Sequence, residues 1–313
     1  MSVYTTITED ELSQFLTRYD LGTLRSFEGI SEGIENTNYF VDTEAGRYVL
    51  TIFEQHSFDE LPYFLNIMAF MAEHAIPTAH PIADREGNYL NRLHDKPAAL
   101  VQRLDGCGVE QPNVRQCAVM GETLARFHLA GRDFDGYRAN DRDLSWAERT
   151  FAEIEPYLDE EDKALLRDEL AYQQAQDWAH LPQGVIHADL FTDNALFRGD
   201  ELAGIIDLYY ACNAPWLYDL AVMVNDWARD EENRYDLERV RAIMQAYQQV
   251  RPLTELEQAE WPAAQRMAAL RFWLSRLKDK VLPREGALTM IKNPDVFRQV
   301  LLHHRTEPLP HFA

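Results

Sequence analysis

The first hundred residues contain short stretches in which hydrophobic and polar side chains alternate with the two-residue period of strands. The predicted strands are 25–30, 39–43, 48–53, a segment around Leu90, and 98–104. One segment, 58–74, has a helical period instead, and its apolar stripe consists of Leu61, Phe64, Leu65, Met68 and Met71. Thr8 and Glu11 have the spacing of a capping box and predict an earlier helix start. The pattern therefore indicates an antiparallel meander accompanied by helices.

The pattern changes after 105–108, and helical periodicity dominates the remaining chain. The predicted helices are 114–129, a long charged region at 146–179, 219–228, 237–250, 256–281 and 294–303. One hairpin interrupts them, with apolar runs at 195–197 and 202–206. We therefore predict the α+β class with a bilobal architecture. A small antiparallel-sheet N-terminal lobe would cover 1–104, and a larger, mainly helical C-terminal lobe would cover 105–313.

The 313 residues carry a formal net charge of −22. An acidic chain lacks the basic patch that nucleic acid or an anionic membrane surface requires, so we expect neither as a partner. The apolar runs are short and interrupted by charge, and the N-terminus lacks the basic start and apolar core of a secretory leader. Three scattered cysteines indicate a reducing compartment, and we expect a cytoplasmic protein. The sequence leaves the oligomeric state open.

The strongest chemical signal is H-A-D-L-F-T-D-N at 187–194, followed thirteen residues later by Asp207 in G-I-I-D-L. Kinase-type phosphoryl transfer uses this order: an Asp that accepts the substrate's hydroxyl proton, an Asn five residues later, and an Asp at a strand end. Asp189, Asn194 and Asp207 fill those positions, and one amide oxygen with one carboxylate suits Mg²⁺. Because a hairpin brings its two ends together, Asn194 and Asp207 are expected to reach one ion.

Two alternatives compete with a phosphoryl-transfer site. His187, Asp189 and Asn194 could be ordinary loop polars, with Asp207 a surface acid, but the complete order with its hairpin favours the functional interpretation. A metal hydrolase built on His187 and Asp189 would need further histidine ligands, and the sequence offers none at suitable spacing.

The chain resembles the aminoglycoside phosphotransferase and choline kinase superfamily, which has the protein-kinase-like fold, over nearly its whole length. Within it, the chain is most similar to the bacterial homoserine kinases of this fold. The stretches that carry the similarity are V-Y-T-T-I-T-E-D-E-L, G-I-E-N-T-N-Y-F-V-D-T, Y-V-L-T-I-F-E, G-V-I-H-A-D-L-F-T-D-N, G-I-I-D-L-Y-Y-A-C-N and A-L-R-F-W-L-S-R-L. The resemblance implies phosphorylation of the L-homoserine hydroxyl, with ATP and Mg²⁺ as cofactors and a small amino acid as partner.

The resemblance also implies residue roles around the motif. Asp189 would be the catalytic base, and His187 would brace the loop. Asn194 and Asp207 would bind Mg²⁺. Asp219, in Y-D-L-A, matches the superfamily acid that opens the next helix, although a plain acid at a helix N-terminus, favoured by the helix dipole, is an equally good interpretation.

For the nucleotide, the family's phosphate-covering turn matches 31–38, with candidate contacts Ser31, Gly33, Asn36, Thr37 and Asn38. The match is loose because the segment has one glycine, and a plain polar hairpin loop is the alternative. The adenine is expected against backbone groups near 101–104, where Val101 and Arg103 lie.

One departure from protein kinases concerns the lysine that their third strand places on the phosphates. The corresponding position here is Thr51, as it is in the homoserine kinase pattern. Three explanations compete: Arg47 or Lys96 replaces the lysine, backbone amides suffice, or the chain is a weak or inactive kinase. The complete set of motif residues argues against the last.

The acceptor site has to hold a carboxylate and an ammonium group beside the reacting hydroxyl. A guanidinium fork suits a carboxylate, and Arg271 and Arg276 interrupt an otherwise apolar helix, so they are the first candidates, with a structural ion pair as the alternative. Tyr209 and Asn213 follow the second acid and are candidates for lining the site. A kinase acting on an aminoglycoside, choline or a sugar, and a nucleotide-binding pseudokinase, remain as alternative functions.

Overall fold

The computed structural model describes residues 4–30, 36–283 and 292–312. The chain folds into two compact units, each described here by itself. The first unit is discontinuous and combines Met1–Gly106 with Ala203–Tyr209. The second combines Cys107–Leu202 with Tyr210–Ala313. Of the predicted nucleotide contacts, Ser31 and Gly33 lie outside the described residues.

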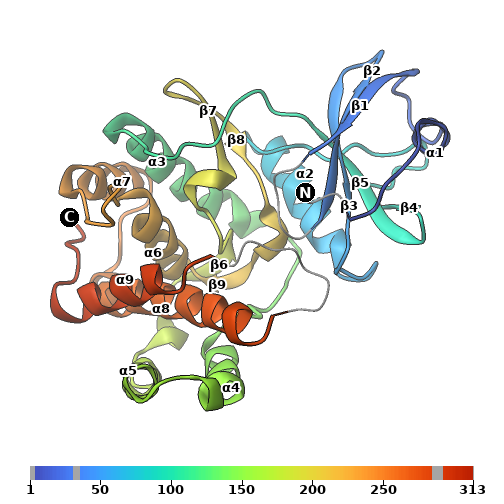
Figure 1. The fold of residues 1–313 in the computed structure, drawn as a ribbon. Helices are drawn as coiled ribbons and strands as arrows, with labels where there is room; N and C mark the ends of the chain where they lie inside the picture. The colour runs from blue at the N-terminus through green and yellow to red at the C-terminus, as the bar shows by residue number, and fades with distance from the viewer. Residues whose placement is uncertain (1–3, 31–35, 284–291, 313) are drawn as a thin grey trace. The chain divides into compact units, whose positions relative to one another are not determined.

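The first unit is built on a five-stranded antiparallel sheet with the order β1-β2-β3-β5-β4 (Figure 1). The strands are β1 (Leu24–Gly29), β2 (Thr37–Thr43), β3 (Arg47–Ile52), β4 (Asn91–Leu93) and β5 (Lys96–Gln102). Helix α1 (Glu9–Leu16) lies on one face of the sheet, and α2 (Leu61–Glu73) lies on the other (Figure 1). These elements are those that the alternating pattern and the single helical stripe predict.

The hydrophobic pattern explains why these elements form. Burial alternates residue by residue along β2, so its inward side chains join the core with those of α1. At the start of α1, Thr8 and Glu11 form the predicted capping box. The segment Ala203–Tyr209 completes the unit, since the Ile205 amide donates to the Pro77 carbonyl at 2.7 Å. Tyr209 packs edge-on against Phe53, with ring centroids 5.1 Å apart.

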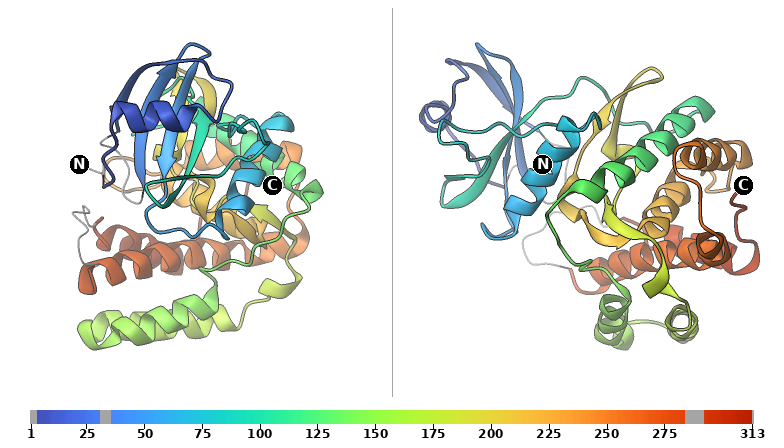
Figure 2. Two further views of the ribbon diagram at one scale, coloured as in Figure 1. Left: turned by 90° about the vertical axis from the view of Figure 1, so that its right-hand side faces the viewer. Right: turned by 180° about the vertical axis from the view of Figure 1, so that it is seen from behind.

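The second unit is mainly helical (Figure 2). Its helices are α3 (Val114–Ala130), α4 (Leu144–Ile154), α5 (Glu160–Gln174), α6 (Trp216–Trp227), α7 (Leu237–Val250), α8 (Glu255–Val281) and α9 (Asp295–Thr306). Strand β6 (Gln183–Ile186) pairs antiparallel with β9 (Cys212–Pro215). In the predicted hairpin β7 (Ala195–Arg198) pairs with β8 (Glu201–Ile205), a strand that begins in the second unit and continues into the first from Ala203. A side chain at Gly121 of α3 would clash with the Ile243 carbonyl of α7, so these helices approach closely.

Two details of the helical half differ from the sequence-based expectation. The region 146–179 is divided rather than continuous: α4 ends at Ile154, and Pro156, which has no amide hydrogen, lies in a short 3₁₀ turn. Asp159 then caps α5 through the Asp162 amide. The β6–β9 pair was not predicted, because four-residue strands are too short to show a period.

The C-terminal segment is built into the second unit. The backbone of Leu309 donates to the Gln265 side chain at 3.0 Å and accepts from Trp261 at 2.8 Å, both on α8. Among the helices that the structure describes, none combines the length and the apolar character that a membrane span requires.

Candidate active site

The motif at 187–194 forms a loop that leaves β6 after Ile186 and reaches β7 through a 3₁₀ turn, Thr192–Asn194. Ala188 in this loop has φ = 66°, a conformation that a non-glycine residue seldom adopts without support. The His187 ring is fully buried, and its Nδ1 accepts from the Asp189 amide at 3.3 Å. The ring therefore bridges the residues on both sides of the strained position, which fits the bracing role expected of it.

The support for this strained turn comes from Asp219 in the first turn of α6. Its carboxylate is fully buried and accepts from the amides of His187 at 2.8 Å and Ala188 at 2.7 Å. It also faces the Nε2 atom of His128 on α3 at 3.0 Å. Asp219 is thus more than a plain acid at an exposed helix start: it fixes the backbone that carries Asp189.

Neighbouring groups keep the Asp219 carboxylate charged although it is buried. Burial raises the pKa of Asp219, but the hydrogen bond from His128 and the nearby His187 outweigh it, so the pKa lies below its usual value. Burial lowers the pKa of His128, although Asp219 opposes the shift. The partners of His128 then assign its tautomer: Nε2 donates to Asp219, and Nδ1 accepts from the Tyr247 hydroxyl at 2.8 Å.

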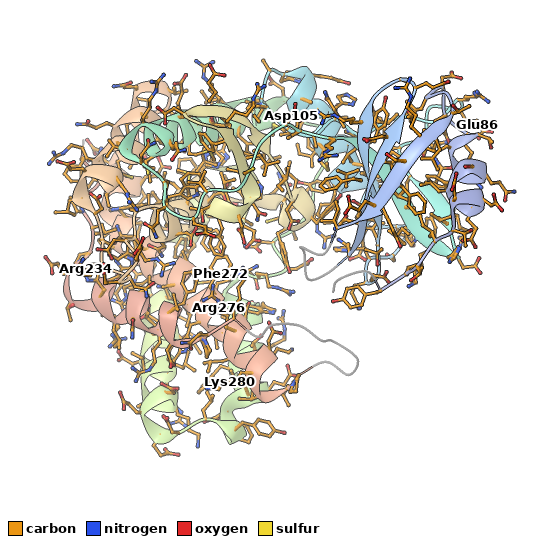
Figure 3. All side chains as sticks on the ribbon, turned by 45° about the horizontal axis from the view of Figure 1, so that its top comes forward. Glu86, Asp105, Arg234, Phe272, Arg276 and Lys280 are labelled. Atoms are coloured by element: carbon orange, nitrogen blue, oxygen red, sulfur yellow. The ribbon has the colours of Figure 1, made fainter. Side chains whose placement is uncertain are left out.

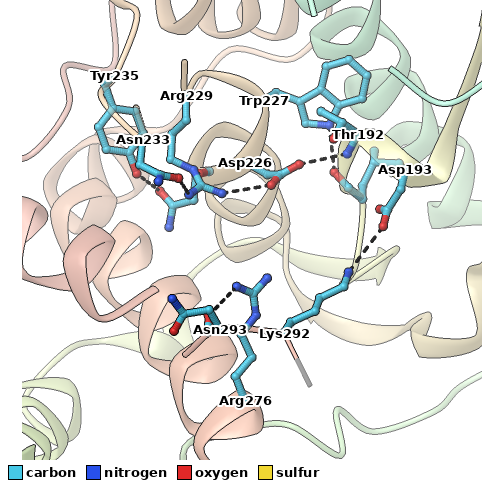
Figure 4. A network of polar contacts seen from close by, with 12 residues as sticks. Thr192, Asp193, Asp226, Trp227, Arg229, Asn233, Tyr235, Arg276, Lys292 and Asn293 are labelled. Carbon is cyan, nitrogen blue, oxygen red and sulfur yellow. Dashed lines mark hydrogen bonds and ion pairs between the residues drawn. The ribbon is translucent and has the colours of Figure 1, made fainter. Parts of the chain in front are cut away.

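The other end of α6 holds the end of the same loop (Figure 4). The Trp227 indole donates to the Leu190 carbonyl at 3.1 Å, and the Asp226 carboxylate accepts from the Thr192 amide at 2.9 Å. Arg229 pairs with Asp226 at 3.1 Å and keeps that carboxylate in place. Asp219 and Asp226 are seven residues apart, two turns on one helix face, so α6 clamps the loop at both ends.

Asn194 is oriented by the loop itself. Its side-chain NH₂ donates to the Asp189 carbonyl at 2.8 Å, which leaves Oδ1 as the acceptor atom that a cation would meet. Among the described residues no group of three or more His, Cys, Asp or Glu side chains could hold a metal ion by itself. Mg²⁺ in nucleotide sites needs no such cage, because phosphates and waters supply most of its ligands.

Asp207 and Tyr209 belong to the first unit. Asp207 follows β8 with φ = 62°, so the chain turns sharply at this acid. Tyr209 is partly buried among Phe53 and Phe64. Burial and the Asp207 charge raise the pKa of Tyr209, while a hydrogen bond with Thr51 acts in the opposite direction.

The described part of the predicted phosphate loop is tied to its own sheet. Thr37 accepts from the amides of Tyr4 at 2.9 Å and Thr5 at 3.0 Å, and its hydroxyl donates to Glu54 at 2.6 Å. The Asn36 side chain accepts weakly from the Glu54 amide, at 3.4 Å. These contacts anchor the start of β2, from which the loop departs.

Thr51, at the position of the kinase lysine, donates to Asn38 at 2.8 Å. Lys96 pairs with Glu54, a carboxylate that also accepts from Thr5 and Thr37. Burial raises the pKa of Glu54, but its hydrogen bonds with Lys96, Thr37 and Thr5 bring it below the usual value.

The remaining candidate nucleotide residues lie elsewhere on the sheet. Arg47 pairs with Asp105 at 2.6 Å, both well exposed. Val101 is buried in β5, and the Arg103 guanidinium lies 3.7 Å from the Phe40 ring centroid. Strand register separates the two candidate cations, because β2 pairs Asp42 with Arg47 at one end and Thr37 with Ile52 at the other.

Arg271 on α8 is buried, with 5% of its surface exposed. Its guanidinium lies 5.2 Å from the Tyr210 ring and 3.9 Å from the Phe272 ring. Within the described part of the chain no carboxylate pairs with Arg271, and its Nε has no hydrogen-bond partner. The structural ion pair weighed as the alternative is therefore not found among these residues.

Arg276 lies one turn further along α8 than Phe272 (Figure 3). It donates to the Asn293 carbonyl at 3.0 Å (Figure 4). Its guanidinium carbon lies 4.5 Å from the Phe297 ring centroid. Burial lowers the pKa of its guanidinium to about 10. Asn213 in β9 accepts from the Arg138 amide at 3.0 Å, so its side chain holds the segment before α4.

Sequence reasoning missed several residues that shape this region. His128, Asp226 and Trp227 carry no motif of their own. Tyr218 stands next to Asp219 in Y-D-L-A, and its hydroxyl is buried without a partner among the described residues. That adjacency was the one available signal, and nothing in the pattern distinguished Tyr218 from an ordinary core tyrosine.

Comparison with known proteins places this geometry in context. The family model described as the phosphotransferase enzyme family matches residues 26–253. The chain is 48% identical to the homoserine kinase of Methylobacillus flagellatus, covering 97% of this chain and 95% of that protein. It is 44% identical to the homoserine kinase of Neisseria meningitidis serogroup B, covering 96% and 99%.

Solved structures resemble the chain in fold. An amicoumacin kinase in complex with AMP-PNP, Ca²⁺ and Ami aligns with a TM-score of 0.71 at 15% identity, covering 96% of this chain and 98% of that one. A spectinomycin phosphotransferase in complex with ADP and spectinomycin aligns with a TM-score of 0.71 at 14% identity and the same coverage. The predicted α+β, protein-kinase-like fold and the predicted superfamily are confirmed.

Proposed function

The chain belongs to the phosphotransferase enzyme family, and from that membership we propose that it is an ATP-dependent homoserine kinase. The observation that carries the proposal is the near-full-length match to homoserine kinases at 43–48% identity. The motif Asp189–Asn194, clamped on α6, supplies the chemistry that such an enzyme needs. The product is O-phospho-L-homoserine, a precursor of threonine.

In the proposed reaction the side-chain oxygen of L-homoserine attacks the γ-phosphorus of ATP. A new oxygen–phosphorus bond forms, the bond to the β,γ-bridging oxygen breaks, and ADP leaves. Asp189 orients the hydroxyl and takes its proton. His187 and Asp219 keep the loop backbone in the conformation that presents Asp189, so much of the rate comes from positioning.

We assign Mg²⁺ coordination to Asn194 Oδ1 and to the Asp207 carboxylate. These are hard oxygen donors, and the orientation of the Asn194 amide fits such a role because its NH₂ is already used by Asp189. When bound, the ion neutralises charge on the transferring phosphoryl group.

The nucleotide is assigned to the first unit. The backbone near Val101 and Arg103 would bind the adenine, and the loop with Ser31, Gly33, Asn36, Thr37 and Asn38 would cover the phosphates. Lys96 is the better candidate for the missing cation. It pairs with Glu54 at the sheet end where Thr37 begins β2, whereas Arg47 lies at the opposite end of β2 and β3.

For the acceptor, we assign the carboxylate of homoserine to Arg271. A buried guanidinium without a carboxylate partner among the described residues is costly, and a bound anion relieves that cost. Arg276 adds positive charge five residues further along α8, and Asn213 holds the segment before α4. Tyr209 is assigned to the edge of the acceptor site.

A coupled assay of ADP release tests the function with Mg-ATP and a panel of L-homoserine, L-serine, choline and kanamycin. Turnover with L-homoserine well above the other three supports the proposal, and Asp189→Asn should abolish it without loss of fold. Turnover with another acceptor keeps the family chemistry but refutes homoserine. Binding of ATP with no turnover on any acceptor would favour a pseudokinase.

A further inference from the structure

Several buried polar side-chain atoms of the second unit have no partner among the described residues, and they include Arg271 Nε on α8 and the Tyr218 hydroxyl on α6. Tyr218 has 4% of its surface exposed. Folding removes such a hydroxyl from water without giving it a new hydrogen bond, and this costs free energy. A phenylalanine at the same position would not carry that cost. An unsatisfied buried group in a well-packed helix therefore needs an explanation.

Other buried tyrosines of the chain do not share this feature. Tyr19 accepts from Asn91 at 3.1 Å, Tyr39 donates to the Thr5 carbonyl at 2.9 Å, and Tyr247 contacts His128 at 2.8 Å. Among the tyrosines that the structure describes, Tyr218 is the one with a buried hydroxyl that has no partner. The exception lies beside the catalytic loop, since the adjacent Asp219 binds that loop's amides.

The charges around Tyr218 indicate what its hydroxyl would meet. Among the charged groups around Tyr218, Arg271 has the largest effect and lowers the pKa of the hydroxyl, while Asp189 raises it. Burial raises the pKa of Tyr218, so the phenol keeps its proton and acts as a donor. A donor that lies in the field of a guanidinium whose Nε has no partner suits an anionic oxygen. The effect of Asp189 on the same hydroxyl suits a group on the molecule being phosphorylated.

We propose that the Tyr218 hydroxyl and the Arg271 guanidinium together bind the carboxylate of the acceptor, and that Tyr218 sets the preference for acceptors that carry one. The inference rests on the proposed function, because it identifies the carboxylate as that of homoserine. Arg271 supplies the charge, and Tyr218 supplies a hydrogen bond that fixes the orientation of the carboxylate.

The test compares Tyr218→Phe with wild type and with Tyr19→Phe, a control in which a satisfied buried hydroxyl far along the chain is removed. For Tyr218→Phe we expect a melting temperature equal to or above wild type and a KM for L-homoserine raised about tenfold, or about 1.4 kcal/mol. The value of kcat should change less than threefold. For Tyr19→Phe we expect the reverse: a lower melting temperature and an unchanged KM.

A KM within twofold of wild type in Tyr218→Phe would overturn the inference. A melting temperature that falls together with the loss of activity would overturn it too, because it indicates a structural role. Failure of the proposed function is seen separately, in the wild-type panel. If the preferred acceptor there has no carboxylate, both ideas fall; if it is another hydroxy acid, the Tyr218 test is repeated with that acid.

Discussion

Asp219 offers the most direct test of how the loop is held. In Asp219→Asn the side chain keeps its shape, but one oxygen acceptor becomes an NH₂ donor. The carboxylate accepts from two backbone amides, at 2.8 and 2.7 Å, and from His128 at 3.0 Å. The single oxygen of an asparagine side chain can accept from the donors on one side of the carboxylate. Its NH₂ group then faces a donor on the other side, where no hydrogen bond can form.

The expected cost follows from these contacts. Hydrogen bonds to charged groups contribute about 1.5–3 kcal/mol each, and leaving a buried donor unpaired adds to the loss. We expect the free energy of unfolding to fall by about 3–5 kcal/mol, a large share of the roughly 5–15 kcal/mol of a typical protein. Release of the strained turn at Ala188 also moves Asp189, so kcat should fall at least about 100-fold.

Urea unfolding followed by tryptophan fluorescence gives the stability, and ADP release with L-homoserine gives kcat. Glu231→Gln is the matched control, because it removes one carboxylate charge at an exposed position of the same unit. The control should match wild type in both assays. An Asp219→Asn protein with wild-type stability and kcat would refute the view that this carboxylate fixes the loop.

Three further predictions follow from buried groups. In Gly121→Ala, the new methyl group would clash with a carbonyl on α7, and we expect the melting temperature to fall, with a cost of about 3 kcal/mol or more. Burial lowers the pKa of His304 to about 3, so its stabilising effect is complete above pH 6.5 and decreases as the pH falls. Between pH 6.5 and 5, wild type should lose roughly 2 kcal/mol more unfolding free energy than His304→Gln. In Lys96→Met, Glu54 loses its cation, and unfolding free energy at pH 7 should fall by about 2 kcal/mol, a difference that shrinks below pH 4.5. The same change should raise the KM for ATP about tenfold, whereas Arg47→Met should not.

The sheet was predictable because each strand has one buried and one exposed face. The alternation along Thr37–Thr43 and the stripe from Leu61 onward therefore appear directly in the sequence. The helices of the second unit were predictable in number except at 146–179, where Pro156 and the cap at Asp159 end one helix and start another. Both residues can be read from the sequence as a helix breaker and a helix cap, but the charged pattern on either side of them resembles that of one continuous helix.

The candidate site could be proposed from the sequence where its residues follow each other in a fixed order. Asp189 and Asn194 are five positions apart, and the loop between them needs little else to be recognised. The supports of the loop come from helices far along the chain: His128 on α3, and Asp226 on α6. Their roles depend on three-dimensional contacts, and single polar residues in helices give no sequence signal of such contacts.

The discontinuity of the first unit affects how the protein is made. During synthesis the ribosome passes Gly106 about 100 residues before it adds Ile205 and Tyr209. At 5–20 residues per second, synthesis of the intervening residues takes about 5–20 s, and during that time the sheet lacks the contacts of Ile205 and Tyr209. Until then the Pro77 carbonyl lacks the Ile205 amide and the Phe53 ring lacks Tyr209. The first unit therefore cannot complete its fold before Ala203–Tyr209 has been synthesised, and a gene fragment that stops at Gly106 encodes an incomplete unit.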